Sequence, residues 1–153
     1  MKNTTLISTA ITELHFCPMM LFGVGTLDRV GELTRRYGSK ALLVTDKGVQ
    51  EAGISDRVAR GLSSAQVEMV LFDGVSPNPD SANVEAGLQA GSGHGIEVIV
   101  SVGGGSSHDC AKAIALVAAN GGQIGDYEGV GLSAHPSLPI VAINTTAGSG
   151  AEM

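Results

Sequence analysis

The chain has 153 residues, of which 43% are hydrophobic and 16% are charged, and its net charge is −6. This composition supports a packed core and argues against disorder, and the absence of a basic run argues against a nucleic-acid groove. No apolar run reaches the roughly 18 to 20 residues that span a bilayer, and polar residues interrupt the N-terminal apolar stretch, so it is not a signal peptide. We therefore expect a cytoplasmic protein that contacts neither nucleic acid nor membrane.

Two further features of the composition restrict the fold. Because the chain has no Trp and only 3% aromatic residues, its core must be built from Val, Ile, Leu and Ala, as in parallel sheets covered by helices. Cys17 and Cys110 have no motif spacing, so we expect two reduced thiols and no disulfide.

The first elements in chain order are strand-like pieces near residues 13–16 and 20–22. A helical pattern follows over residues 26–37 and stops at Gly38. The apolar side of that helix holds Leu27, Val30, Leu33 and Tyr37. The next segment, "KALLVTD", is typical of a buried strand and ends at Asp46.

The middle of the chain continues the alternation. Residues 48–65 have a helical pattern that is interrupted near Gly53, and "VEMVLFDG" predicts the next strand. In the loop "VSPNPD", two prolines flank Asn78 and forbid a helix there. Asp80 stands where an N-cap belongs, before a helix that runs to about Gly93.

The last elements are the strand "IEVIVSV", a helix over residues 106–120 that glycines close, and the short buried strand "LPIVAIN". Strands that alternate with helices predict βαβ units, a parallel sheet and helices on both of its faces. The chain then stops in the loop "TTAGSGAEM", and we interpret it as a piece of a longer protein.

The turn "SVGGGSSHD" lies at the carboxyl end of a strand, where open α/β sheets bind ligands. Residues 103–105 are glycines, which allow positive φ and bring no Cβ into the path of a ligand. The helix that starts near Ser106 offers unpaired N–H groups and the positive end of its dipole. Together they favour a phosphate or pyrophosphate site. The alternative is a tight turn with Ser107 as N-cap.

The turn matches neither the Walker A loop nor the G-x-G-x-x-G dinucleotide fingerprint in its usual order. Instead an acidic residue, Asp46, precedes the glycines. Its carboxylate could accept both hydroxyls of an adenosine ribose and repel a 2′-phosphate, or it could be a helix N-cap. Thr145, Thr146 and Ser149 are hydroxyls in a loop after a strand, and they either line the same crevice or form an ordinary polar loop.

Two motifs, "VGGGSSHDCAKA" and later "PIVAINTTAGSGAE", resemble the iron-containing (group III) alcohol dehydrogenase family. "VTDKG" and "SPNPD" also fall where that family has similar segments. The ending "NTTAGSGAEM" is most similar to the methanol and short-chain alcohol dehydrogenase branch. Many relatives have Pro in place of Asn144 and Ser in place of Ala151, which leaves the alcohol open.

The resemblance implies that residues 1–153 form a Rossmann-like (dehydroquinate-synthase-like) NAD-binding α/β domain. A C-terminal helical metal domain would be absent from this chain. The intact enzyme would transfer hydride from a primary alcohol to NAD, giving the aldehyde, with Fe²⁺ or another divalent metal. This fragment would supply the cofactor-binding half and would be inactive alone.

The resemblance also implies residue roles. Asp46 would hold the adenosine ribose. The pyrophosphate would contact Gly104, Gly105, Ser106 and Ser107. The remaining cofactor path would be lined by Asn78, Thr145, Thr146 and Ser149. Asp109 would cap the turn, and Lys112 would either contact phosphate or lie in solvent.

The family's iron ligands, one aspartate and three histidines, would lie beyond the end of this chain. The histidines present are His15, His94, His108 and His135. They are scattered, with no helical pair spacing, so we expect none of them to bind metal. We expect His108 to be exposed in the first helical turn.

Two alternative functions remain open at this point. One is a non-catalytic dinucleotide-binding module, and the other is a relative of glycerol dehydrogenase. We expect a homo-oligomer, or self-association of the severed domain through an exposed apolar face.

Overall fold

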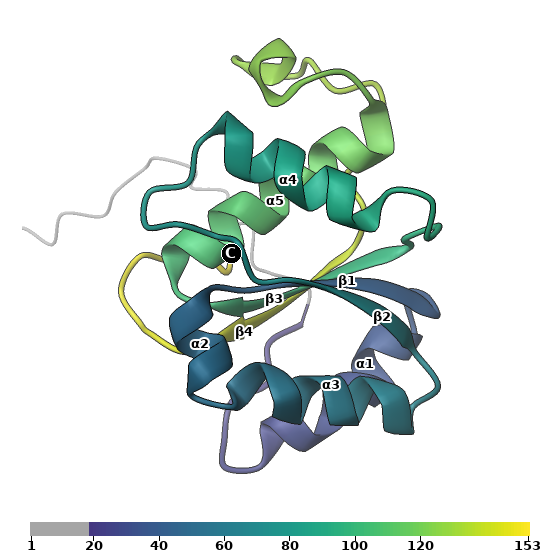
Figure 1. Cartoon of the computed structure of the whole chain (residues 1–153), viewed down its shortest axis with the longest axis vertical. Coiled ribbons are helices and arrows are strands. Elements are labelled where there is room, and N and C mark those ends of the chain that lie inside the picture. The colour runs from purple at the N-terminus through teal and green to yellow at the C-terminus, as the bar shows by residue number, and fades with distance from the viewer. Residues whose placement is uncertain (1–18) are drawn as a thin grey trace, which may run out of the picture.

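Four runs rich in Val, Ile and Leu form one parallel sheet, as the alternation of elements predicts (Figure 1). The computed structural model describes residues 19–153. The strands are β1 (Lys40–Val44), β2 (Glu68–Phe72), β3 (Val98–Gly103) and β4 (Ile140–Asn144), in the spatial order β2-β1-β3-β4. The predicted strand near 13–16, Cys17 and His15 lie outside the described residues.

Helices cover both faces of the sheet, which confirms the predicted α/β architecture. Their bounds are η1 Thr26–Arg29, α1 Val30–Arg35, α2 Lys47–Glu51, α3 Ile54–Ser64, α4 Ser81–Gly91, α5 Gly105–Asn120 and η2 Ile124–Tyr127. Figure 1 shows α1, α2 and α3 on one side of the sheet and α4 and α5 on the other. None of the helices formed by residues 19–153 combines the length and the apolar character that crossing a bilayer requires.

Because side chains alternate along a strand, the sheet has a separate core on each face. Leu42 of β1 and Ile99 of β3 pack toward α4 and α5, together with Ile114. Leu43 and Val100 pack on the opposite side, in the core that includes the α3 residues. All six residues of β3 are buried, because this strand is central and both of its faces are covered.

The edge strand β4 is less buried than the sequence suggests. It pairs with β3 in parallel register, with Val100 opposite Val141 and Gly103 opposite Asn144. Its residues are half-buried or exposed, since among the described residues it has a strand neighbour on one side only.

The N-terminal elements differ from the prediction in two ways. Residues 20–22 form no strand, and Phe22 is exposed, because within the described chain nothing pairs with this segment. The helix predicted over 26–37 is divided into the 3-10 helix η1 and the short α1, and Tyr37 lies beyond its end with 46% of its surface exposed.

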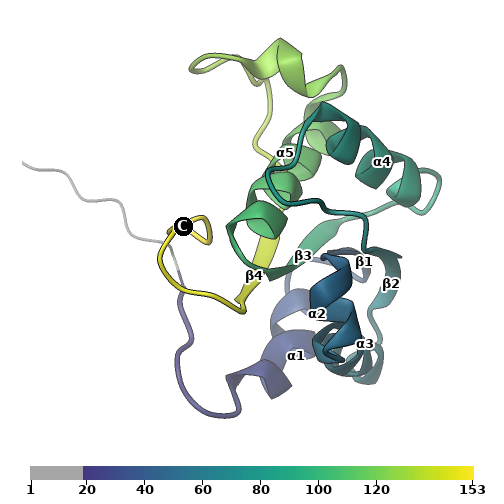
Figure 2. The same cartoon turned by 60° about the vertical axis from the view of Figure 1, so that its left-hand side comes forward.

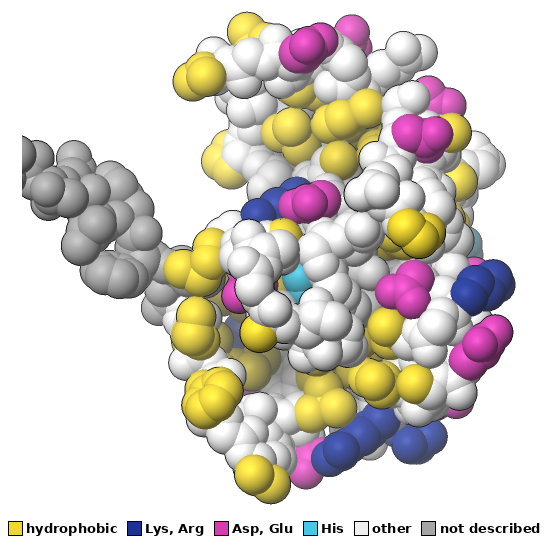
Figure 3. All heavy atoms as spheres, turned by 90° about the vertical axis from the view of Figure 1, so that its left-hand side faces the viewer, with side chains coloured by type: hydrophobic (Ala, Val, Ile, Leu, Met, Phe, Trp, Pro, Cys, Tyr) yellow, Lys and Arg dark blue, Asp and Glu magenta, His cyan; other side chains and the backbone are white. Residues whose placement is uncertain are grey.

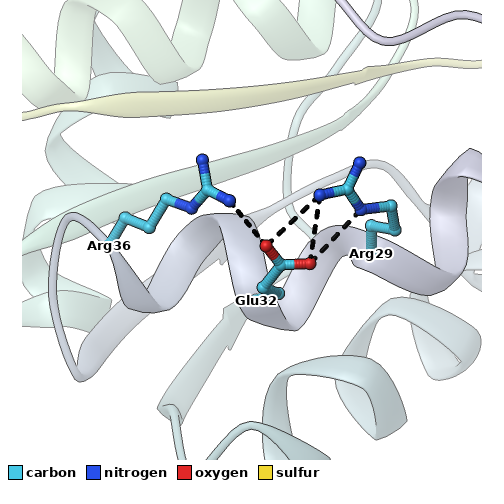
Figure 4. A network of polar contacts seen from close by, with 3 residues as sticks. All are labelled: Arg29, Glu32 and Arg36. Atoms are coloured by element: carbon cyan, nitrogen blue, oxygen red, sulfur yellow. Dashed lines mark hydrogen bonds and ion pairs between the residues drawn. The ribbon is translucent and has the colours of Figure 1, made fainter.

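Three exposed charged residues form a network around α1: Glu32 within it, Arg29 at the end of η1 and Arg36 at the C-cap of α1 (Figure 4). Glu32 accepts hydrogen bonds from Arg36, four residues later, at 2.5 Å and from Arg29, three residues earlier, at 3.2 Å. The Arg36 hydrogen bond is the main cause that lowers the pKa of Glu32. Pairs at these spacings favour the helical conformation of a short segment.

Candidate functional site

The carboxyl ends of β1 and β3 lie side by side and send the chain to opposite faces of the sheet. After β1 the chain enters α2, and after β3 it enters α5, on the other face (Figures 1 and 2). Such a divergence opens a crevice at the end of a parallel sheet. The candidate site is built around it.

Buried Thr45 fixes these strand ends relative to one another. Its hydroxyl donates to the carbonyl of Val102 at 2.8 Å, and its amide donates to the carbonyl of Phe72 at 2.9 Å. Its own carbonyl accepts from the amide of Val75 at 3.3 Å. Three neighbouring strands are thus held in register where the site begins.

Asp46 follows Thr45 and has two partners. One carboxylate oxygen accepts from the amide of Val49 at 3.0 Å, so Asp46 is the N-cap of α2. The other accepts from the hydroxyl of Ser107 at 3.2 Å. The N-cap alternative for Asp46 is therefore confirmed, and the same half-buried carboxylate also faces the start of α5.

The glycine turn joins β3 to α5 without a side-chain cap. The helix begins at Gly105, one residue earlier than predicted, and its N-cap is Gly104. The alternative in which Ser107 caps the helix is wrong, because Ser107 lies in the first turn and is buried against Asp46.

The main chain of this turn has no room for side chains. Gly103 has φ +152°, and a Cβ there would lie 2.3 Å from the Ser107 hydroxyl oxygen. A Cβ on Gly104 would lie 2.9 Å from Thr146 Oγ1, and one on Gly105 would lie 2.9 Å from Ser149 Oγ. The positive φ of Gly103 also favours glycine, whereas a Cβ on Gly104 or Gly105 would require the facing side chain to shift.

The start of α5 carries amides that the helix itself does not use. The first intrahelical hydrogen bond runs from the amide of His108 to the carbonyl of Gly104, at 3.2 Å. The amides of Gly105, Ser106 and Ser107 precede it and belong to the positive end of the helix dipole. This arrangement suits an anion.

A pocket of about 480 Å³ lies over this turn. Five of the predicted site residues line it together: Asp46, Gly104, Gly105, Ser106 and Ser107. Five further residues line it that residue type alone does not single out: Lys47, Gly48, Val75, Ser76 and Pro77. They belong to the segments "VTDKG" and "VSPNPD", both of which resemble segments of the family. The motifs therefore indicated this part of the site, although no single residue type there indicated a role.

The other four predicted site residues do not line this pocket. Asn78 is exposed at its rim, with φ +54°, and its amide donates to Ser106 Oγ at 3.3 Å. The amide of Thr145 donates to the carbonyl of Gly103 at 2.9 Å. Thr146 and Ser149 approach the glycines from the loop that follows β4 (Figure 2).

Two expectations about the first turns of α5 are wrong. His108 is 2% exposed, because its ring turns inward and its Nδ1 lies 2.8 Å from the hydroxyl of Ser101. Asp109 does not cap the turn: it is exposed, and the N-cap is Gly104. The helix turns Asp109 toward solvent and His108 toward the sheet, an orientation that depends on where the helix starts.

Lys112 contacts another part of the chain, and its expected phosphate contact stays a prediction. Its ammonium donates to the carbonyl of Met153 at 2.7 Å, so it ties α5 to the loop after β4. It does not line the pocket.

Cys110 is free and buried, and burial raises the pKa of its thiol to about 11. Within residues 19–153, no group of three or more His, Cys, Asp or Glu side chains is placed to hold a metal ion.

Comparison with known proteins shows which family the chain belongs to. A sequence profile of the family described as iron-containing alcohol dehydrogenase matches residues 17–153. Alcohol dehydrogenase 4 of Saccharomyces cerevisiae is 45% identical over 146 residues, which are 95% of this chain and 38% of that protein. The NAD-dependent methanol dehydrogenase of Bacillus methanolicus is 41% identical, over 93% of this chain and 38% of that protein.

The fold agrees with these matches. A crystal structure of 1,3-propanediol oxidoreductase superimposes with a TM-score of 0.81 and 44% identity, over 85% of this chain and 34% of that one. The chain thus spans little more than a third of the length of its relatives. It belongs to the iron-containing alcohol dehydrogenase family.

Proposed function

We propose that the pocket at the carboxyl ends of β1 and β3 binds the adenosine diphosphate part of NAD. Residues 1–153 would be the cofactor-binding domain of an alcohol dehydrogenase that oxidises a small primary alcohol to its aldehyde. The observation that carries this proposal is the bare main chain of the glycine turn, which opens onto a pocket that also contains Asp46.

The pyrophosphate would lie on the turn. Its charge would be met by the amides of Gly105, Ser106 and Ser107 and by the helix dipole. The hydroxyl of Ser106 would add a donor. The turn fits this group because Gly104 and Gly105 line the pocket with main chain alone.

The adenosine ribose would lie at Asp46. The carboxylate keeps acceptor capacity beyond the hydrogen bonds from Val49 and Ser107, since an ionised carboxylate offers about four lone-pair sites. It would accept hydrogen bonds from the ribose hydroxyls and repel a 2′-phosphate. The path beyond the pyrophosphate would be lined by Asn78 at the pocket rim and by Thr145, Thr146 and Ser149 in the loop after β4. When bound, NAD supplies the hydride acceptor.

The test is a calorimetric titration of the chain with NAD⁺ and NADP⁺, for the wild type and for Asp46→Asn. Asparagine can still cap α2, so the variant removes the charge and keeps the helix start. A unit charge 4 Å away is worth about 1 kcal/mol even in water, or about fivefold in affinity. We expect wild type to prefer NAD⁺ and the variant to lose about that much of the preference. An unchanged preference would show that Asp46 does not contact the ribose. A failure to bind either dinucleotide would show that the pocket is not the cofactor site.

The iron of the family is not assigned to residues of this chain. No group of three or more His, Cys, Asp or Glu side chains among residues 19–153 is placed to hold it. The prediction is that the purified chain, supplied with NAD⁺, Fe²⁺ or Zn²⁺ and a short alcohol, forms no NADH. Metal-dependent turnover by the verified 153-residue chain would contradict the proposal that this chain binds the cofactor and a separate domain binds the metal.

A binding module without catalysis is the second candidate, and the lack of a metal-ligand group among residues 19–153 agrees with both candidates. Adding the C-terminal part of a relative separates the two candidates. Restored alcohol oxidation supports the enzyme half, whereas tight NAD binding with no turnover supports the module.

A further inference from the structure

Lys47 lines the candidate site and is engaged by a carboxylate outside it. Among the described residues that line the pocket, it is the only one with a cationic side chain. Its ammonium lies 2.6 Å from Oδ2 of Asp73, the residue that directly follows β2. The Asp73 side chain is 26% exposed and that of Lys47 is 69% exposed. Asp73 therefore holds an exposed cation at the edge of the pocket.

The strand order places this ion pair on a defined side of the site. Since β1 lies between β2 and β3, Asp73 at the end of β2 and the glycine turn at the end of β3 flank Asp46 from opposite sides. A nucleotide with its phosphates on the glycine turn and its ribose at Asp46 would present its 2′ position near Lys47. This step rests on the proposed function of the pocket.

We propose that Asp73 is a second determinant of cofactor choice, acting through Lys47. By pairing with the ammonium, Asp73 withholds from the pocket the only cationic side chain among the described residues that line it. The three charges of Asp46, Lys47 and Asp73 then sum to a single negative charge, which favours NAD over NADP. Without Asp73, Lys47 is free to turn toward the ribose and form a charge-assisted hydrogen bond with a 2′-phosphate.

Four variants of the chain test this proposal: Asp73→Asn, Lys47→Gln, the double variant with both substitutions, and Asp28→Asn as a matched control. Asp28 forms an equally short exposed pair with Arg57, at 2.6 Å, and neither residue lines the pocket. The probes are 5′-AMP and 2′,5′-ADP, which differ only in the 2′-phosphate. NAD⁺ titrated in parallel reports whether the pocket works.

The measured quantity is the affinity ratio of 2′,5′-ADP to 5′-AMP. We expect Asp73→Asn to raise the ratio about threefold to tenfold, because the freed ammonium gains a phosphate partner. The double variant should return to the wild-type ratio, and Asp28→Asn should not depart from it. The gain should shrink as salt is added, since the groups are exposed.

The outcomes separate this proposal from the one on which it rests. If 5′-AMP and NAD⁺ bind but Asp73→Asn leaves the ratio unchanged, Asp73 has no part in cofactor choice and the site itself stands. A gain that persists in the double variant would arise without the Lys47 ammonium, and a gain that appears equally in Asp28→Asn would reflect net charge. Either result would overturn the role of Lys47. If none of the nucleotides binds, the proposed function fails and this inference fails with it.

Discussion

His108 is a buried imidazole in the first turn of α5, and its two nitrogens have different surroundings. Nδ1 lies 2.8 Å from the Ser101 hydroxyl, while Nε2 has no hydrogen-bond partner among the described residues. Burial is the main cause that lowers the pKa of His108. The Asn144 side chain opposes this shift without forming a hydrogen bond of standard geometry with the ring. The folded protein therefore favours the neutral ring.

This lowered pKa predicts a loss of stability in mild acid. The contribution of the neutral ring is complete above the unfolded-state pKa of about 6.5. It is lost as pH falls from there through the lower folded-state pKa, because the unfolded chain takes up a proton that the folded chain resists. Urea unfolding at several pH values between 8 and 5 measures this decline. The charged groups that act on the ring are Glu152, Lys112 and Asp109. A substitution of His108 leaves all three in place.

The control is His108→Gln, which is polar and does not titrate. The variant should lose stability at pH 8, by about 1–3 kcal/mol, since Ser101 loses its partner. Its stability should depend less on pH between 8 and 5 than that of wild type. Equal pH dependence in the two proteins would show that His108 titrates at its ordinary pKa.

Cys110 provides a second prediction at this scale. Because its thiol is buried and its pKa is raised to about 11, little reactive thiolate forms at neutral pH. In a Cys17→Ser variant, which leaves Cys110 as the only thiol, alkylation by iodoacetamide should be slow in buffer and fast in denaturant. Rapid labelling of the folded variant would contradict the burial of this side chain.

At the scale of elements, α1 and α3 pack closely through glycines. A Cβ on Gly31 would lie 2.1 Å from the carbonyl oxygen of Gly61 and 2.7 Å from the Cβ of Ala65. A Cβ on Gly61 would lie 2.8 Å from Val30. The first obstacle is backbone, so it cannot be relieved by a change of rotamer, and the two helices would have to separate.

Gly31→Ala should therefore destabilise the fold by about 1–3 kcal/mol, the usual range for overpacking, although alanine favours the helix by up to about 1 kcal/mol. Gly125→Ala in η2 is the matched control, because nothing lies within 4 Å of its added Cβ. Thermal unfolding of both variants measures the difference. If Gly31→Ala is as stable as the control, the close contact of α1 with α3 is wrong.

The elements that the sequence predicts best are those whose signals are local. The break near Gly53 separates α2 from α3 at a φ of +74°, and Asp80 caps α4 through the amide of Asn83 at 3.1 Å. The apolar runs of β1 and β3 likewise become the buried centre of the sheet. Residue type alone carries these signals.

What the sequence misses depends on partners far along the chain. Residues 20–22 have strand-like side chains but no strand beside them in the described chain. The inward turn of His108 depends on Ser101 across the layer. The ion pair of Lys47 with Asp73 joins residues that only the neighbouring positions of β1 and β2 bring together. For the candidate site, the motifs identified the glycine turn, and the fold added the rest of the lining.

At the scale of the whole molecule, two groups of hydrophobic side chains are exposed. One group, on the segment before η1, is Met19, Met20, Phe22 and Val24, and the other, in the loop after η2, is Val130 and Leu132. Phe22 is 99% exposed and Val130 is 98% exposed. Hydrophobic side chains also gather across the face seen in Figure 3. Exposed apolar groups of this kind mark surfaces that associate.

We therefore expect the chain to self-associate in solution. Light scattering after size-exclusion chromatography should give a mass that exceeds one chain and rises with protein concentration. A Phe22→Ser/Val24→Ser variant and a Val130→Ser/Leu132→Ser variant test the two groups separately. The variant with the interacting group removed should approach the monomer mass, since each buried apolar side chain contributes about 1.5–3 kcal/mol. Neither substitution touches the residues that line the pocket, so binding of NAD⁺ should be unchanged. A wild-type chain that remains monomeric at every concentration would show that these side chains bind no second copy.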